Sequence, residues 1–250
     1  MRTGPAWWLR CLALIIWRDV KTQRGLFVSI VVFQSLMGAG GALVYGFVLG
    51  DVDSTRLTFI ATGAPVLALI PVGFVFLPGA IGDLKVDGSY DYTRSMPVPQ
   101  TAGAVATLCV FSATALPGAA FSLAVAAWRY DIDLAISASL APAVVLTAVM
   151  ASSVGYATGH AIANPLMINL LGNITLFSVL MFSPIAFPIE QFPRWLAAVH
   201  QALPFHHMGV AIRSGLTEGL ATDLTRSYLT LTGWTVAAWM LARRAIARRA

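Results

Sequence analysis

Charged residues are scarce in this sequence. Only 11% of its 250 residues are Asp, Glu, Lys or Arg, whereas 58% are apolar or aromatic. Soluble domains carry about 25% charged residues. The mean hydropathy is +0.76. This composition excludes a soluble domain, a disordered chain and a fibrous protein, and it predicts an integral membrane protein.

Cysteine and lysine are scarce as well. Cys11 and Cys109 lie far apart in apolar surroundings and predict neither a disulfide framework nor a metal site. The two lysines, Lys21 and Lys85, each follow an aliphatic residue, so the Gly-Lys-Ser/Thr end of a Walker A motif is absent. The chain therefore does not hydrolyse ATP by that motif. We predict no catalytic residue, no cofactor and no metal ion in it.

Long uncharged stretches predict an all-α integral membrane protein. A charge at the middle of a bilayer costs about 2.5–3.5 kcal/mol, so such stretches mark membrane spans. The longest, 134–189, exceeds one span of about 20 residues and breaks most naturally at 159–165, where Gly, Asn and Pro disfavour a helix. We expect six spans, at about 26–49, 57–80, 101–127, 135–158, 167–186 and 227–246. The last has the shortest uncharged stretch, and its aromatic and terminal arginine residues suit interfacial anchoring.

The first 25 residues predict an amphipathic helix on the membrane surface. Arg10, Arg18, Lys21 and Arg24 fall within one arc of a helix, and apolar residues including Trp8 occupy the opposite side. A solvated basic tail is the alternative. A signal peptide is disfavoured because basic residues continue after the start.

Basic residues predict the orientation. With both termini in the cytoplasm, eleven of the sixteen Lys and Arg and four acids lie inside, giving +7 inside and −2 outside. The positive-inside rule favours this arrangement. The basic residues are then membrane anchors, so we do not expect nucleic-acid binding.

Apart from Arg243 and Arg244 at the end of the sixth, the predicted spans contain no Asp, Glu, Lys or Arg. Ion-coupled transporters usually need such residues at membrane depth, because the driving ion binds there. If this chain is a transporter, its energy therefore comes from a source other than ion coupling. Small residues recur every fourth position along the first span: Gly38, Ala42, Gly46 and Gly50. We interpret this stripe as a packing face for another helix, with a lipid-facing stripe as the alternative.

Two segments are unusual for a membrane protein. The cytoplasmic loop 83–99 is polar and carries five charges, which predicts a docking surface rather than membrane anchors alone. The outside segment 187–226, with the end of the fifth span before it, is too apolar for a solvated loop and too rich in proline for a span, which predicts a re-entrant hairpin. The residues that mark this hairpin are Pro184, Phe187, Pro188, Pro193, Trp195, Pro204 and Arg213. His200, His206 and His207 have no metal-ligand spacing, and their role is not predicted.

These features together resemble the permease subunit of type-2 ATP-binding-cassette (ABC) exporters, the family of drug, nodulation-factor and polysaccharide exporters. The similarity lies in the basic amphipathic start, six spans in about 250 residues, a charged Gly-Ser-Tyr loop ending in Met96-Pro97-Val98-Pro99, and the Pro-rich stretch before the last span. Asp83 and Asp87 stand where many relatives have a glutamate near the start of that loop.

The resemblance implies a half-transporter in a bacterial cell membrane. Two permeases, as a homodimer or a heterodimer, would pair in the bilayer, and two separate ATPase subunits would bind ATP beneath them. The N-terminal helix and the 83–99 loop would receive the ATPase movement. The residues that would couple to the ATPase are Asp83, Lys85, Asp87, Tyr90, Asp91 and Arg94.

Several functions stay open from the sequence. An uncharged pathway favours export of a hydrophobic drug, as in antibiotic resistance, or of a natural product or lipid-linked compound. A polysaccharide or glycolipid exporter is the alternative. The rivals are a membrane-embedded lipid-modifying enzyme that uses the 200–213 region and a scaffold or channel subunit. An adjacent gene for an ABC ATPase would distinguish the exporter from both.

Overall fold

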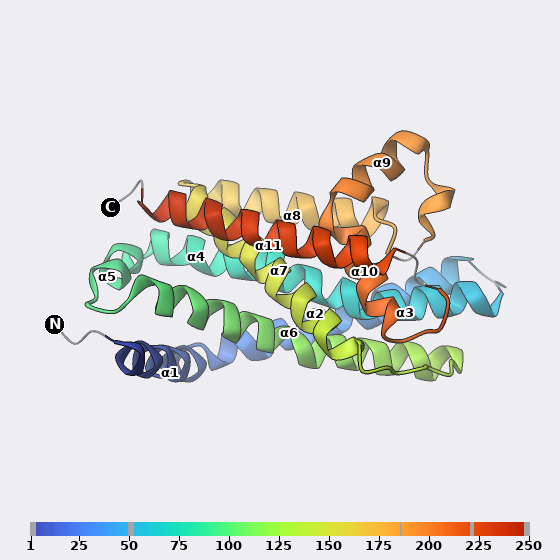
Figure 1. The fold of residues 1–250 in the computed structure, drawn as a ribbon, viewed down its shortest axis with the longest axis horizontal. Helices are drawn as coiled ribbons and strands as arrows, with labels where there is room; N and C mark the ends of the chain where they lie inside the picture. Colours follow the sequence, from blue (N-terminus) through green and yellow to red (C-terminus); the bar gives the residue numbers. More distant parts are fainter. Residues whose placement is uncertain (1–3, 50–52, 186, 221–222, 248–250) are drawn as a thin grey trace.

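The structure is a computed structural model that describes residues 4–49, 53–185, 187–220 and 223–247, and within these ranges every regular element is a helix. The long helices run side by side in an elongated bundle (Figure 1). The elements are α1 (Pro5–Thr22), α2 (Arg24–Leu49), α3 (Ser54–Pro71), the π-helix η1 (Val72–Phe76), α4 (Leu77–Val86), α5 (Ser89–Ser95), α6 (Gln100–Tyr130), α7 (Leu140–Ala161), α8 (Pro165–Phe182), the 3-10 helix η2 (Ile189–Gln191), α9 (Arg194–Ala202), α10 (Pro204–Ser214) and α11 (Leu224–Ala247).

The bundle has two distinct ends. The short helix α5 lies at one end together with α1 and the last turns of α11, and we call this the α5 end (Figure 1). The helices α9 and α10 lie at the other end, which we call the α10 end.

Five helical segments are long and apolar enough to cross a membrane. They are Arg24–Val48, Ser54–Val86, Gln100–Tyr130, Leu140–Ala161 and Pro165–Phe182. This confirms the prediction of an all-helical membrane protein. The 24-residue α11 is long enough but is not among the five, because polar residues interrupt its apolar sequence. The sixth span stays a prediction.

Two predicted boundaries shift for local reasons. The fifth span ends at Phe182 rather than at 186, because Pro184 cannot continue a helix. The fourth begins at Leu140 rather than at 135. The chain just before it is extended instead, and the amides of Ala135 and Ser137 donate to the carbonyls of Leu216 and Gly215 at 3.0 and 2.9 Å.

The second span is one continuous helical segment of 33 residues, Ser54–Val86, and it is the most buried of the five. It turns into the π-helix η1 directly after Pro71, which lacks the amide that an α-helix needs. The segment reaches past the predicted end at residue 80, so Asp83 and Lys85 lie on α4 and not in a loop.

Glycine lets neighbouring helices touch the backbone of this central segment. A Cβ atom added at Gly155 of α7 would lie 1.8 Å from the carbonyl oxygen of Gly73. One added at Gly172 of α8 would lie 2.7 Å from the carbonyl oxygen of Phe74. The π-helix is therefore held between α7 and α8 by contacts that only a residue without a side chain permits.

The small-residue stripe of α2 faces the interior of the same chain. A Cβ atom at Gly38 would lie 2.6 Å from Cβ of Ser122 and 2.8 Å from the carbonyl oxygen of Ala64. Ala42 is fully buried, and its carbonyl accepts a hydrogen bond from the hydroxyl of Tyr130 at 2.7 Å. Gly46 packs under the same tyrosine. Gly50 lies outside the described residues. These contacts place α2 against α3 and α6.

The amphipathic helix α1 packs across α6 at the α5 end (Figure 1). The indole nitrogen of Trp8 donates to Thr101 Oγ1 at 3.0 Å, and Cys11 and Asp19 are buried on the same side. Leu9 and Trp17 remain exposed on another side, with 58% and 61% of their surface accessible. An exposed apolar side of this kind suits a helix that lies in the membrane interface.

Two glycines of α2 test the packing of this helix. Gly38→Leu should destabilise the protein by about 1–3 kcal/mol, because the side chain collides with α3 and α6. Gly40→Leu is the matched control, since a Cβ atom there meets nothing within 4 Å. Thermal unfolding of the detergent-solubilised protein, followed by tryptophan fluorescence, measures both. Equal melting temperatures for the two variants would show that α2 does not pack in this way.

Candidate functional site

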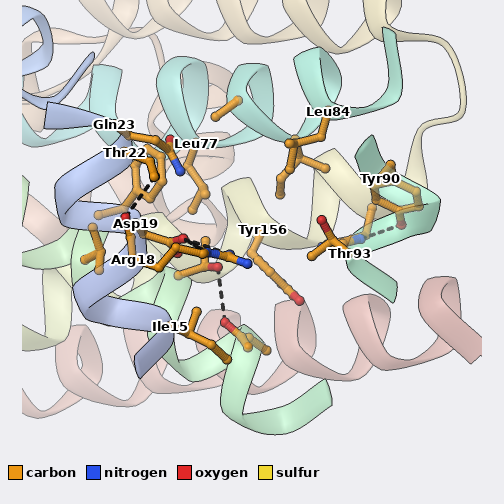
Figure 2. Close-up of a pocket in the computed structure, with 18 of the residues that line it drawn as sticks. Ile15, Arg18, Asp19, Thr22, Gln23, Leu77, Leu84, Tyr90, Thr93 and Tyr156 are labelled. Carbon is orange, nitrogen blue, oxygen red and sulfur yellow. Dashed lines mark hydrogen bonds and ion pairs between the residues drawn. The ribbon is translucent and has the colours of Figure 1, made fainter. Parts of the chain in front are cut away.

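A cavity of about 620 Å³ lies at the α5 end. Its walls come from α1, α2, α4, α5, α6, α7 and the end of α11, which meet there from distant parts of the sequence (Figure 2). The predicted amphipathic helix and the predicted coupling loop are therefore two walls of one site. Its volume falls in the range of about 300–1,000 Å³ that is typical of small-molecule sites.

Lys85 holds the coupling segment to the end of α7. Its ammonium group donates to the carbonyl oxygens of Gly159 and Ile162, the latter at 2.6 Å. These carbonyls belong to the last turn and the C-cap of α7, where a helix leaves acceptors unpaired and carries partial negative charge. The described contacts of Lys85 are thus inside the chain.

Tyr90 forms a second attachment between α5 and α7. Its hydroxyl lies 2.7 Å from Nδ1 of His160, and its ring is 8% exposed. The ring of Tyr156 contacts His160 at a tilt of 56°, with centroids 4.3 Å apart. Lys85 and Tyr90, two predicted coupling residues, therefore set the position of α5 against the bundle.

Several exposed residues of the coupling segment surround these attachments; Asp83, Asp87 and Tyr92 line the cavity, whereas Val86 and Asp91 do not. Asp83, Asp87 and Asp91 are exposed, as are Val86 and Tyr92, which expose 74% and 68% of their surface. The segment turns at Gly88, whose φ of 76° lies in the left-handed region that glycine adopts without strain. The side chain of Arg94 lies outside the described part of the chain. The outward surface of this segment is therefore acidic and partly apolar.

Arg18 and Asp19 of α1 form an ion pair on the opposite wall of the cavity. A guanidinium nitrogen lies 2.8 Å from Asp19 Oδ1, and Asp19 is only 8% exposed (Figure 2). Sequence reasoning placed Arg18 in a basic surface arc and missed this pair. The burial of Asp19 could have been predicted from its position, because it shares a helical face with Cys11 and Ile15, which is unusual for an exposed acid.

The α10 end is organised by Arg213. Its guanidinium donates to Thr62 Oγ1 at 3.1 Å and to the carbonyls of Phe59 and Ile185 at 3.3 and 3.0 Å. It also lies 3.5 Å from the centre of the Phe59 ring, and its side chain is 2% exposed. Burial lowers the pKa of Arg213 to about 9, so the group stays charged at neutral pH. One cation thus joins α10 to α3 and to the chain after α8.

The other hairpin residues form the rest of this end. Pro184 is buried, Pro204 begins α10, and the ring of Phe187 lies edge-on to Tyr45 at 5.4 Å. Pro188 and Pro193 precede η2 and α9, respectively. Trp195 of α9 exposes 69% of its surface, and α9 projects from the bundle (Figure 1).

The histidines of the hairpin have structural surroundings. His207 lies 3.0 Å from both Ser227 Oγ and the carbonyl oxygen of Gln201, and so joins α10 to α11 and the end of α9. Burial, followed by the nearby charges of His207 and Arg213, lowers the pKa of His206 to about 4. Within the described ranges, no three His, Cys, Asp or Glu side chains gather as a metal ion would require.

Comparison with known proteins gives one family. The model of the family described as ABC-2 type transporter matches residues 10–217, which include both the cavity walls and Arg213. A search of the curated proteins finds no match to this chain.

Arg213→Ala tests whether one cation holds the α10 end together. The change leaves Thr62 and two carbonyls without their donor, so we expect a loss of about 2–4 kcal/mol in the free energy of unfolding. Arg226→Ala removes an exposed arginine at the same end and serves as the control. Chemical denaturation monitored by fluorescence compares the two. A similar, small effect for both would mean that Arg213 is not the organising contact.

Proposed function

Because this chain belongs to the ABC-2 type transporter family, we propose that it forms the transmembrane pathway of an ATP-driven exporter of a hydrophobic drug, natural product or lipid-linked compound. It is a multi-pass membrane permease subunit without a catalytic domain. Permeases of this family pair with ATPase subunits, which bind the ATP. The missing Walker A motif agrees with that division of labour.

The observation that carries the proposal is the acidic segment at the α5 end. It joins two spans, it is fixed to α7 through Lys85 and Tyr90, and it exposes the side chains of Asp91 and Val86, which do not line the cavity. A segment anchored at its inner side can transmit a movement that is applied to its outer side. We propose that this outer side docks on the ATPase and that a second permease completes the pathway, as a homodimer or a heterodimer.

The proposed orientation places the α5 end in the cytoplasm of a bacterium and the hairpin outside. The basic residues, which divide eleven to five, support it. In this arrangement α11 is the sixth span, returning the chain to the α5 end along α7 (Figure 1). Uncharged spans favour a hydrophobic substrate over a polysaccharide, which needs polar partners along its path.

Cysteine labelling tests the orientation. In a background with Cys11→Ala and Cys109→Ala, Gln191→Cys should react with a membrane-impermeant thiol reagent in intact cells. Ser95→Cys should react only after the cells are opened, because it lies at the α5 end. Both positions are exposed in the structure, so accessibility within the protein does not limit either reaction. The reverse pattern would invert the proposed topology.

Asp91→Arg tests the docking surface. The tagged wild-type permease, purified from its host membrane, should carry ATP-hydrolysing activity with it. Asp91→Arg should reduce that activity by at least about tenfold, because charge reversal at an interface opposes docking. Asp133→Arg, an exposed acid at the α10 end, should leave the activity unchanged.

Two outcomes would count against the proposal. If the wild-type protein purifies without associated hydrolysis, the exporter assignment fails. If Asp91→Arg retains the full activity while the wild type carries it, the ATPase docks elsewhere.

A further inference from the structure

The described walls of the α5-end cavity come from several helices of one chain. Its volume of about 620 Å³ suits a drug-sized molecule. The chemistry of the lining then decides which class of molecule fits.

The charges on the lining are mostly negative. Among the described lining residues are three carboxylates, those of Asp19, Asp83 and Asp87, and one guanidinium, that of Arg18, which is paired with Asp19. The nearby ammonium of Lys85 is directed to carbonyls at the end of α7. The described lining therefore holds more carboxylates than guanidinium groups beside a largely apolar interior, and these carboxylates would attract a cation.

Aromatic rings add to this preference. Five of the lining residues are aromatic: Phe27, Tyr90, Tyr92, Phe111 and Tyr156. The faces of such rings attract cations, most strongly where water is excluded. The ring of Tyr90 already has the ammonium of Lys85 5.2 Å from its centre. Combined carboxylates and aromatic faces are the recognition chemistry of alkylated and aryl cations.

The polarity of the lining changes along each wall. In α4 the carboxylates of Asp83 and Asp87 lie at the charged end of the helix, and Leu77 lies deeper. In α6 the lining runs from Gln100 near the end to Phe111 deeper in the span, where Phe111 meets Phe27 edge-on at 5.8 Å. One end of the cavity thus suits a charge and the other suits an apolar body.

We propose that this cavity binds a lipophilic cation, with the positive charge attracted by the carboxylates of the lining and the apolar body against Leu77 and Phe111. This inference rests on the proposed function, because it names the chemical class of the exported compound. The site selects against lipophilic anions, which meet three carboxylates, and binds uncharged molecules of the same shape more weakly.

A pair of ions of nearly equal size and opposite charge tests this selectivity. The permease alone, without ATPase, is placed in phosphatidylcholine nanodiscs, and equilibrium dialysis measures the binding of tetraphenylphosphonium and tetraphenylborate above that to empty nanodiscs. We expect saturable binding of the cation, at one site per chain, and no saturable binding of the anion. Saturable binding of both would show an apolar site without charge selection and would overturn the proposal.

Two charge variants in the same ion pair should act in opposite directions. Asp19→Asn removes a carboxylate and leaves Arg18 unpaired, so the Kd for tetraphenylphosphonium should rise at least about tenfold. Arg18→Gln removes the guanidinium that neutralises Asp19 and leaves this carboxylate unpaired, so the Kd should fall. A purely structural role of the pair would move both constants in the same direction, because either variant breaks the same contact.

A steric variant locates the bound cation without changing any charge. Gly103 lines the cavity, and a Cβ atom there meets nothing within 4 Å, so Gly103→Leu fills open space without a collision. It should abolish saturable binding and keep the melting temperature of the wild type. Gly233→Leu, at an equally open glycine of α11 that does not line the cavity, is the matched control. Unchanged binding in Gly103→Leu would place the cation elsewhere.

The binding measurement needs no ATPase and no knowledge of the natural substrate. Failure to bind tetraphenylphosphonium would remove this inference while the hydrolysis associated with the wild-type permease would still support the exporter. Binding of tetraphenylphosphonium without associated ATP hydrolysis would support the cation site and remove the exporter assignment. The two proposals therefore fail separately.

Discussion

The central constraint on this structure is that a long helical segment, uncharged over residues 57–82, is buried among other helices, so its backbone polar groups must be satisfied within the protein. The segment α3–η1–α4 meets that constraint by staying helical through three prolines, with a π-helix after Pro71. The irregular turn is tolerated because protein and not lipid surrounds it. Gly155 and Gly172 bring α7 and α8 against its carbonyls, so the course of this segment is fixed from two sides. Where α4 emerges at the α5 end follows from that packing.

The two ends of the bundle accommodate charged side chains in different ways. At the α10 end, Arg213 is buried with neutral acceptors and an aromatic face, and it holds three segments in one arrangement. At the α5 end, most carboxylates remain exposed or line the cavity, where they keep contact with water or with a partner. The α10 end is thus built for rigidity, and the α5 end offers surfaces to other molecules.

At the α5 end, α4, α5 and α7 contribute to both proposed sites. Lys85 and Tyr90 attach the coupling segment to α7, while Asp83 and Asp87 lie on the cavity side of the same segment. A molecule in the cavity and an ATPase on the outer surface would therefore contact opposite faces of the same coupling segment. Each could change the position of that element for the other, which is the physical basis for coupling between two sites.

The sequence by itself determined the membrane class, four of the five spans to within about five residues at each end, and the family, because charge is so costly in lipid that its absence marks a span. It also indicated the glycine stripe of α2 and the importance of the 83–99 and 187–226 segments. Only the tertiary structure decided that Lys85 and Tyr90 turn inward, that Asp19 pairs with Arg18 on a cavity wall, and that Arg213 joins three segments. Arg18 and Asp19 are neighbours in sequence, but the other partners lie far away in the chain, up to 154 positions from Arg213 to Phe59. Hydrophobic periodicity describes one helix at a time, whereas these contacts depend on how helices from distant parts of the chain pack together.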